Sequence, residues 1–361
     1  MAEMLNGKVA IVTGSGRGIG RGIAKLMAAE GASVVVVDPG VNVDGSGQDQ
    51  SVAEQVVSEI KAAGGNAAAC MESVTEMEGG EKIVQAAVDN FGKLDIVVTC
   101  AGILRDRMIF NMSEEEWDDV IAVHLKGTFT VVKNACILFR QQRSGRIITF
   151  SSESGLMGNS GQANYGAAKS GIAGFTKVVA KDMGRYGVTV NSIAPRASTR
   201  MIADIPDSAA EIRARSGVAP IAGDEELANL DPDHIAPFVA YLASDFSENV
   251  NGQTFLVYGD TISLVSQPRP QKAIYEPSGT WDIEKLSQMA RDVLTKDIPN
   301  PAPAREPIPG RCNPNAPPGC GLDPRGPQFA LVPETPPVPR HLQSSASSLH
   351  IPIPGPPPPP P

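Results

Sequence analysis

Short apolar runs alternate with segments of helical periodicity along most of this chain. Residues 9–13 form an apolar run, residues 19–29 carry apolar side chains at helical spacing, and residues 33–37 are almost pure valine. Apolar runs of this length are typical of parallel strands that are buried on both faces. The alternation continues with strands expected at 67–71, 94–99, 146–151, 189–193 and 254–257, and helices at 52–63, 80–90, 114–135, 165–185 and 232–243. This pattern predicts an α/β fold with a doubly wound parallel sheet, whose ligands bind outside the carboxyl ends of the strands.

Proline content divides the chain into unequal parts. Of its 31 prolines, 22 lie between residues 299 and 361, where regular helices and strands cannot form. We therefore expect a single domain over residues 1–262, a C-terminal extension with a short helix over 263–298, and a disordered Pro-rich tail over 299–361. The alternative for the tail is a polyproline ligand, because it contains two overlapping PxxP motifs.

Composition disfavours several classes of protein. A hydrophobic content of 42% without a run of about twenty apolar residues disfavours a membrane span. A net charge of -9 without a basic cluster disfavours nucleic acid and anionic membranes as partners. Five cysteines are too few for a disulfide scaffold, and the start of the chain lacks an apolar run after positive charges, so we expect a cytoplasmic protein. The Cys and His residues are scattered, so no metal site is expected.

A glycine string follows the first expected strand and opens the first expected helix. It places Gly14, Gly18 and Gly20 at the spacing of a dinucleotide-binding loop. Gly14 permits the tight turn, Gly18 lets backbone approach a pyrophosphate, and Gly20 lets the helix pack close to the sheet. The helix N-terminus favours the negative charge. Alone, the string is compatible with an ordinary strand-to-helix turn, but in this context it predicts a cofactor site of the Rossmann type.

Asp38 stands at the end of the second expected strand, about twenty residues after the glycine loop. A carboxylate there accepts hydrogen bonds from both ribose hydroxyls of an adenosine and repels a 2′-phosphate, which favours NAD over NADP. Arg17 has the opposite effect, because a cation beside the ribose attracts a 2′-phosphate. We give Asp38 the greater weight, so NAD is the expected cofactor. The alternative for Asp38 is a solvated turn before Pro39.

Three residues around the fifth expected strand form a candidate proton-transfer set. Ser152 lies at the carboxyl end of that strand, and Tyr165 and Lys169 are four positions apart in the following helix, on one face. Lysine beside a phenol is expected to lower the pKa of Tyr165 from about 10, so that the phenol exchanges a proton with a substrate hydroxyl or carbonyl near neutral pH. Ser152 can hold the same substrate oxygen, and hydride transfer belongs to the cofactor.

These motifs together resemble the short-chain dehydrogenase/reductase family, over roughly residues 5–260. Residues 101–107, 123–127 and 230–237 add a narrower similarity to the (3R)-hydroxyacyl-CoA dehydrogenase domain of multifunctional β-oxidation enzymes and their bacterial relatives. The resemblance implies a catalytic set of Ser152, Tyr165, Lys169 and His124. It also implies that the cofactor contacts Gly14, Ser15, Arg17, Gly18, Ile19, Gly20, Asp38, Ser73, Val74, Cys100, Ala101, Gly102, Tyr165, Lys169, Pro195 and Thr199.

Three positions depart from the usual pattern of the family. Cys100 replaces an asparagine, and a buried free thiol is the simpler interpretation. His124 replaces a second asparagine, and in the family this asparagine orders a water beside the lysine. The multifunctional subgroup has the same histidine. This favours His124 as a fourth member of the proton relay over a core residue whose hydrogen bonds are satisfied. Arg196 replaces a glycine after Pro195, so the turn around the nicotinamide must differ. Arg196 either contacts a CoA phosphate or is a solvated loop residue.

The resemblance implies an NAD-dependent oxidoreductase that interconverts a secondary alcohol and a ketone, with a 3-hydroxyacyl-CoA and its 3-oxoacyl thioester as the favoured pair. The alternatives are a hydroxysteroid dehydrogenase, an NADPH-dependent 3-oxoacyl reductase, and a non-catalytic NAD-sensing scaffold whose tail recruits a partner. Residues 203–230 are where a substrate lid is expected. A homodimer or homotetramer joined through long helices is expected from the family.

Overall fold

The computed structural model describes residues 4–47, 49, 51–197 and 230–301. By its contacts the chain divides into two compact units, Met1–Arg269 and Pro270–Pro361. Thr199, most of the expected lid and the expected tail beyond residue 301 lie outside the described residues.

The first unit is built on an eight-stranded sheet in the order β3-β2-β1-β4-β5-β6-β7-β8. Its strands are β1 (Val9–Thr13), β2 (Ser33–Val37), β3 (Asn66–Cys70), β4 (Ile96–Thr99), β5 (Gly145–Phe150), β6 (Val188–Arg196), β7 (Thr254–Tyr258) and β8 (Thr261–Leu264). The helices are α1 (Gly18–Ala29), α2 (Ser51–Ala62), α3 (Met77–Phe91), α4 (Glu114–Ile121), α5 (Gly127–Gln142), α6 (Glu153–Leu156), α7 (Ala163–Gly184) and α11 (Ala236–Ala243). Short 3-10 or π turns complete it: η1 (Ile109–Asn111), η2 (Ala122–Lys126), η3 (Pro232–Ile235) and η4 (Asp245–Ser247). Strands β1 to β7 are parallel and β8 is antiparallel to β7, which confirms the predicted doubly wound sheet.

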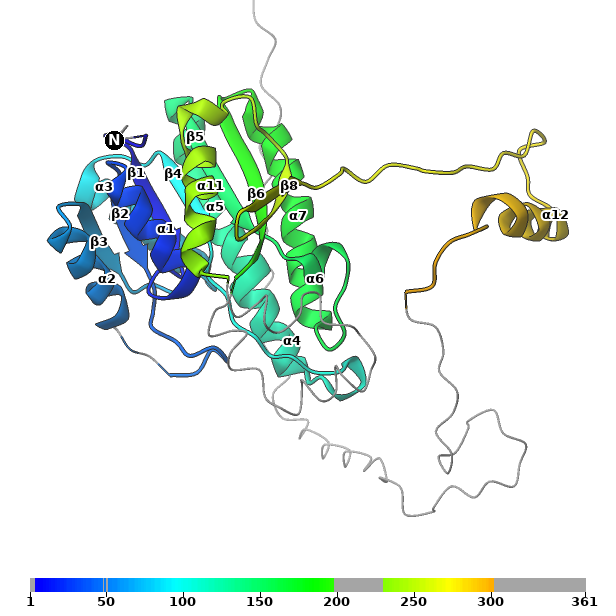
Figure 1. The fold of residues 1–361 in the computed structure, drawn as a ribbon, viewed down its shortest axis with the longest axis horizontal. Coiled ribbons are helices and arrows are strands. Elements are labelled where there is room, and N and C mark those ends of the chain that lie inside the picture. The colour runs from blue at the N-terminus through cyan, green and yellow to red at the C-terminus, as the bar shows by residue number, and fades with distance from the viewer. Residues whose placement is uncertain (1–3, 48, 50, 198–229, 302–361) are drawn as a thin grey trace, which may run out of the picture. The chain divides into compact units, whose positions relative to one another are not determined.

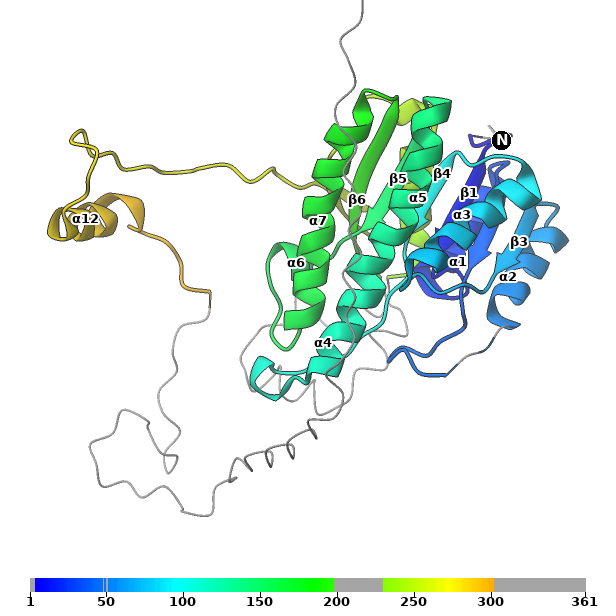
Figure 2. The same cartoon turned by 180° about the vertical axis from the view of Figure 1, so that it is seen from behind.

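Helices cover both faces of the sheet. Helices α1 and α11 lie on the face seen in Figure 1, and α3, α5 and α7 lie on the face seen in Figure 2. Strand β2 shows how one strand serves both layers. Val34 and Val36 belong to the same core as Ile23 of α1, whereas Val35 belongs to the core that contains Ile83 of α3. Because successive side chains point to opposite faces and both faces are buried, the strand is apolar at nearly every position.

The predicted strands agree with the observed ones to within a few residues, whereas α5 ends at Gln142 beyond the predicted end at residue 135, and α6 has no counterpart in the prediction. Two differences among the strands are informative. Strand β8 has no counterpart in the prediction, because its residues alternate between exposed and half-buried and give no apolar run. Strand β6 continues to Arg196, beyond the predicted end at residue 193, because its last residues pair with β7, Arg196 opposite Tyr258. The sheet is therefore parallel except at its β8 edge.

One long helical stretch deserves comparison with a membrane span. Within the described residues, Glu114–Gln142, which runs through α4, η2 and α5, is long and apolar enough by composition to cross a membrane. However, 44% of its apolar window is buried inside the domain, and Val131 and Ala135 belong to the core beneath the sheet. Part of this helical stretch therefore packs in the core, where an apolar face is required by packing.

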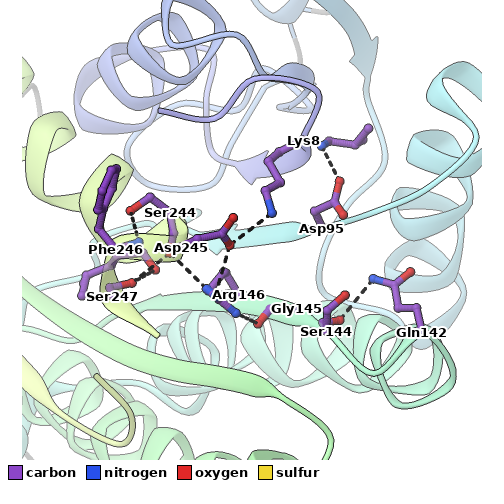
Figure 3. Close-up of polar contacts among 12 residues, drawn as sticks. Lys8, Asp95, Gln142, Ser144, Gly145, Arg146, Ser244, Asp245, Phe246 and Ser247 are labelled. Carbon is purple, nitrogen blue, oxygen red and sulfur yellow. Dashed lines mark hydrogen bonds and ion pairs between the residues drawn. The ribbon is translucent and has the colours of Figure 1, made fainter. Parts of the chain in front are cut away.

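Side chains tie together the amino ends of the central strands (Figure 3). The carboxylate of Asp95 accepts a hydrogen bond of 2.8 Å from the Val9 N–H. Asp245 forms ion pairs with Lys8 at 3.2 Å and with Arg146 at 3.4 Å. The side chain of Asp95 is 20% exposed and that of Asp245 is 73% exposed. Both carboxylates therefore connect segments at the amino ends of the strands, but Asp95 is largely shielded from solvent and Asp245 is exposed to it.

The second unit contains the short helix that the sequence predicts. Helix α12 (Ile283–Met289) continues into η5 (Ala290–Leu294), and none of their residues is buried. The Asp282 carboxylate caps α12 by accepting hydrogen bonds from the N–H groups of the second and third helical residues. Glu276 forms an ion pair with Lys285. Local polar contacts thus define this helix, which lies within the predicted extension over residues 263–298.

Asp95→Ala is expected to cost more stability than Asp245→Ala, although Asp245 joins two cations. The first change leaves the partly buried Val9 N–H without its partner, at a cost of about 1–3 kcal/mol. The exposed pairs of Asp245 contribute less than about 1 kcal/mol. Urea unfolding of both variants measures the difference, and an equal or larger loss in Asp245→Ala would contradict this explanation.

Candidate active site

A cavity of about 390 Å³ lies at the carboxyl ends of the central strands. Most of the residues predicted for the site line it: Gly14, Arg17, Gly18, Ile19, Gly20, Asp38, Ser73, Val74, Cys100, Ala101, Gly102, His124, Tyr165, Lys169 and Pro195. These residues come from chain segments far apart in the sequence. The sheet brings them together because the carboxyl ends of parallel strands meet at one edge.

Two glycines of the glycine loop, Gly14 and Gly20, have no room for a side chain. Gly14 has a φ of +65°, and a Cβ at this position would lie 2.6 Å from the Cα of Ala101. A Cβ on Gly20 would lie 2.2 Å from the carbonyl oxygen of Gly14. The backbone of the loop is therefore packed against both the β4 end and the start of α1, with its N–H groups at a helix N-terminus. This is the environment that a pyrophosphate requires, so the residues present fit a dinucleotide cofactor.

The hydroxyl groups of Ser15 and Thr13 connect this loop to the neighbouring strands by hydrogen bonds. The Ser15 hydroxyl donates to the Val12 carbonyl at 2.6 Å and accepts a hydrogen bond of 3.0 Å from the Val37 N–H. Ser15 is fully buried and lies outside the cavity lining, so its side chain connects β1 to β2. The Thr13 hydroxyl accepts hydrogen bonds from the N–H groups of Cys100 and Ala101, at 3.1 and 3.2 Å. Sequence reasoning missed Thr13, for which the signal was a hydroxyl at the last position of an otherwise apolar strand.

Asp38 is held by backbone at the adenosine end of the cavity. Its carboxylate accepts hydrogen bonds from the N–H groups of Gly16, at 2.9 Å, and Gly40, at 2.8 Å. Arg17 is directed along the neighbouring loop, where it donates to the Val41 carbonyl at 3.3 Å. The carboxylate is therefore fixed in the cavity lining.

Tyr165 is half-buried and Lys169 is buried, one helical turn apart on α7. The Lys169 ammonium lies 5.5 Å from the centroid of the Tyr165 ring and donates to the Phe150 carbonyl at 2.7 Å. Burial lowers the pKa of Lys169 to about 8. Burial raises the pKa of Tyr165 to about 12, and hydrogen bonding to the Ser152 side chain opposes that rise. The expected lowering of the phenol pKa by Lys169 is thus not the dominant effect in this structure, because desolvation outweighs it.

Ser152 approaches the phenol from the start of α6. It is the N-cap residue of that helix, with extended backbone, and its hydroxyl accepts a hydrogen bond of 3.2 Å from the Ser154 N–H. Ser152 is not part of the cavity lining, but its side chain is near enough to Tyr165 to lower the pKa of the phenol. Ser152, Tyr165 and Lys169 therefore form one cluster, as the order of motifs predicts.

His124 lies behind Tyr165 on the π turn η2. It is 1% exposed, and the two rings meet edge to face with centroids 5.1 Å apart. Its Nε2 lies 2.8 Å from the Ile103 carbonyl oxygen, while Nδ1 has no hydrogen-bond partner among the described residues. Burial, assisted by the charge of Lys169, lowers the pKa of His124 to about 3. His124 is therefore a neutral hydrogen-bonding group near the phenol and does not act as a base.

The other two departures from the family pattern have structural explanations. Burial raises the pKa of the Cys100 thiol to about 12, so this residue is a neutral part of the cavity wall. Arg196 has extended backbone at the end of β6 and forms a two-point ion pair with Glu153. Both nitrogens used there donate to Glu153, which disfavours the alternative in which Arg196 contacts a CoA phosphate. Within the ranges that the structure describes, no group of three or more His, Cys, Asp or Glu side chains is arranged to hold a metal ion.

Comparison with known proteins identifies the family. The chain matches the short chain dehydrogenase family over residues 8–209. It is 41% identical over 296 residues to the hydroxyacyl-CoA dehydrogenase ChsB1 of Mycobacterium tuberculosis, a match that covers 80% of this chain and 89% of that protein. The chain belongs to the short-chain dehydrogenase/reductase family. Membership makes it an oxidoreductase that uses a nicotinamide cofactor and acts on the CH–OH group of a small-molecule substrate.

Two further members of the family extend the comparison. The peroxisomal multifunctional enzyme type 2 of Mus musculus is 40% identical over 270 residues, which cover 74% of this chain and 34% of that enzyme. A short chain dehydrogenase from Mycobacterium avium has a solved structure that matches with a TM-score of 0.68 and 42% identity, over 85% of this chain and 98% of that one. The predicted resemblance to hydroxyacyl-CoA dehydrogenases is therefore confirmed, and the predicted non-catalytic scaffold is disfavoured.

Gly14→Ala is expected to abolish binding of the nicotinamide cofactor, because the new methyl group would collide with the Ala101 backbone. Gly64→Ala is the matched control: Gly64 also has a positive φ, +87°, but a Cβ there would meet nothing within 4 Å. Quenching of intrinsic fluorescence on titration with NADH measures binding without turnover. Unchanged binding in Gly14→Ala would show that the loop does not hold the cofactor.

Proposed function

We propose that this enzyme uses NAD to interconvert a 3-hydroxyacyl thioester, such as a 3-hydroxyacyl-CoA, and the corresponding 3-oxoacyl thioester. The observation that carries the proposal is the cluster of Ser152, Tyr165 and Lys169 at the same strand edge as the Asp38 carboxylate. The thioester substrate is supported by the names of the relatives, a hydroxyacyl-CoA dehydrogenase among them. Oxidation of an alcohol and reduction of a ketone use the same groups in opposite order.

The chain's own residues handle the proton in this reaction. Ser152 and Tyr165 hold the substrate oxygen through their hydroxyl groups, and the ionised phenol of Tyr165 removes the hydroxyl proton. Lys169, with a pKa of about 8, is mostly protonated at neutral pH and keeps a positive charge one turn from the phenol. When bound, NAD supplies the hydride acceptor and a further positive charge. These charges oppose the desolvation that raises the pKa of Tyr165 to about 12.

His124 supports the same proton transfer as a neutral relay. Its Nδ1 is buried, lacks a partner among the described residues and belongs to a ring in contact with Tyr165. A buried polar atom without a partner is costly, and an ordered water is the usual remedy. Because the pKa of His124 is lowered to about 3, the ring stays neutral throughout the physiological range and orients such a water without changing its charge.

The preference for NAD follows from the fixed carboxylate of Asp38. Both of its oxygens are anchored by backbone N–H groups, at 2.9 and 2.8 Å, so the side chain is not free to turn away from a 2′-phosphate. Arg17, the residue that favours NADP, is directed to the Val41 carbonyl. A fixed negative charge beside the ribose therefore disfavours NADP.

A homodimer or homotetramer in the cytoplasm completes the proposal. Helices α5 and α7 carry exposed apolar side chains, Phe129 and Ile137 on α5 and Val178 on α7. Exposed residues of this size on adjacent long helices support burial against another copy of the chain.

Tyr165→Phe is expected to lower kcat by about 10² to 10⁴ while cofactor binding is retained, because the variant lacks the group that takes the proton. The assay follows NADH absorbance with a 3-hydroxyacyl-CoA, and a hydroxysteroid serves as the competing substrate. Tyr186→Phe is the control, since Tyr186 lies beyond the end of α7 beside Arg143 and Arg185. Full activity of Tyr165→Phe would contradict the mechanism, and turnover of the steroid alone would contradict the substrate.

Asp38→Ala is expected to raise the ratio of kcat/KM with NADP to kcat/KM with NAD by about tenfold, which corresponds to a repulsion of about 1.4 kcal/mol. The control is Asp44→Ala, which removes another carboxylate from the loop after β2. Among the described residues, the Asp44 side chain is hydrogen-bonded to Ser46. Steady-state rates with both cofactors measure the ratio. A wild-type enzyme that prefers NADP would contradict the assignment.

A further inference from the structure

Glu153 and Arg196 form a buried ion pair beside the catalytic cluster. The Nε and a terminal nitrogen of Arg196 each donate to a different carboxylate oxygen of Glu153. The side chain of Glu153 is 8% exposed and that of Arg196 is 21% exposed. A two-point contact between a planar guanidinium and a carboxylate fixes direction as well as distance.

The ion pair spans the place where two neighbouring strands separate. Strands β5 and β6 are paired up to Phe150 opposite Ile193, and the Ser151 N–H still donates to the Ile193 carbonyl at 2.7 Å. Beyond this point β5 gives way to α6, while β6 continues to Arg196. The register of β5 with β6 ends at the pair of Phe150 and Ile193. The side chains of Glu153 and Arg196 make the connection instead.

Each partner directly adjoins a residue of the site. Glu153 follows Ser152, and Arg196 follows Pro195 in the cavity lining. On its other side Arg196 is held by β7, where its guanidinium carbon lies 4.9 Å from the centroid of the Tyr258 ring. Pairing with β7 and the contact with the Tyr258 ring therefore fix Arg196 on the sheet. Its ion pair in turn fixes the position of the Glu153 side chain.

Helix α6 needs such an anchor because it has only four residues. A helix of one turn does not hold its own shape in water. One side of α6 packs closely on α7, since a Cβ on Gly155 would lie 2.5 Å from the backbone carbon of Lys169. The ion pair holds the other side to β6. Together the two contacts determine the orientation of the helix N-terminus, where Ser152 is the cap.

We infer that Glu153 and Arg196 are positioning residues that hold the Ser152 hydroxyl in register with Tyr165. Neither residue lines the cavity, and both act through the first turn of α6. The inference does not depend on which alcohol is the substrate, so any secondary alcohol that the wild-type enzyme oxidises can report on it. Failure with acyl thioesters alone would therefore count against the proposed function and leave this inference to be tested with another alcohol.

Arg196→Lys tests the inference with little change in charge. Lysine keeps the positive charge but lacks the planar fork, so the ion pair loses its direction. We expect kcat to fall by about tenfold, as for a small misplacement of a catalytic group, with the cofactor dissociation constant unchanged. Arg146→Lys is the matched control, because Arg146 pairs with Asp245 at the opposite edge of the sheet.

The pH profile provides a readout that a purely structural role would not move. The groups that act on the Tyr165 phenol or lie against its ring are Ser152, Asp106, Cys100, Lys169 and His124. Among them only Ser152 adjoins the ion pair, and its hydrogen bond lowers the pKa of the phenol. Weakening that bond raises the phenol pKa, so the rise of kcat for alcohol oxidation with pH is expected to move to higher pH in Arg196→Lys.

A double variant, Glu153→Gln with Arg196→Gln, separates positioning from stability. Replacing one partner leaves the charge of the other without this ion pair, whereas replacing both removes both charges and lessens that penalty. We expect the double variant to melt near the wild-type temperature while its kcat stays low and its pH profile stays shifted. If either folded variant has the wild-type kcat and pH profile, or if kcat recovers together with the melting temperature in the double variant, the inference is wrong.

Discussion

The close contact between the glycine loop and the end of β4 is the constraint on which the rest of this site depends. A Cβ on Gly14 would lie 2.6 Å from the Ala101 Cα, so the backbones of two neighbouring strand ends are in close contact. The Thr13 hydroxyl secures this contact by accepting the Cys100 and Ala101 N–H groups. At this contact the cavity is therefore lined by backbone, and the later strands of the sheet place the functional side chains around it.

Burial sets the electrostatics of the catalytic cluster. It raises the pKa of Tyr165 and lowers those of Lys169 and His124, so each group is driven toward its neutral form. A site of this kind responds strongly to any charge that enters it, because little solvent screens the interaction. The Ser152 side chain acts against this desolvation and lowers the phenol pKa. Hence the precise placement of Ser152 matters more than it would in a solvated site.

Sequence reasoning recovers the parts of the structure that short-range patterns encode. The valines of β2, the spacing of Gly14 and Gly20, and the four-residue separation of Tyr165 and Lys169 each dictate local geometry, and the parallel sheet then brings them to one edge. Other features depend on partners that are distant in sequence. Strand β8 forms only because β7 offers an edge, and Glu153 meets Arg196 across 43 positions. Desolvation of Tyr165 is likewise a property of the folded core, which explains why a lowered phenol pKa was the wrong expectation for this structure.

The most direct test of the whole account is to follow the hydrogen that leaves the alcohol. The enzyme is given NAD and a 3-hydroxyacyl-CoA that carries deuterium at carbon 3, and the reduced cofactor is examined by mass spectrometry. Direct hydride transfer predicts one deuterium in each NADH molecule formed, with none lost to water. NADH without deuterium, or no NADH at all, would contradict the assignment of this cavity as a dehydrogenase site for hydroxyacyl thioesters.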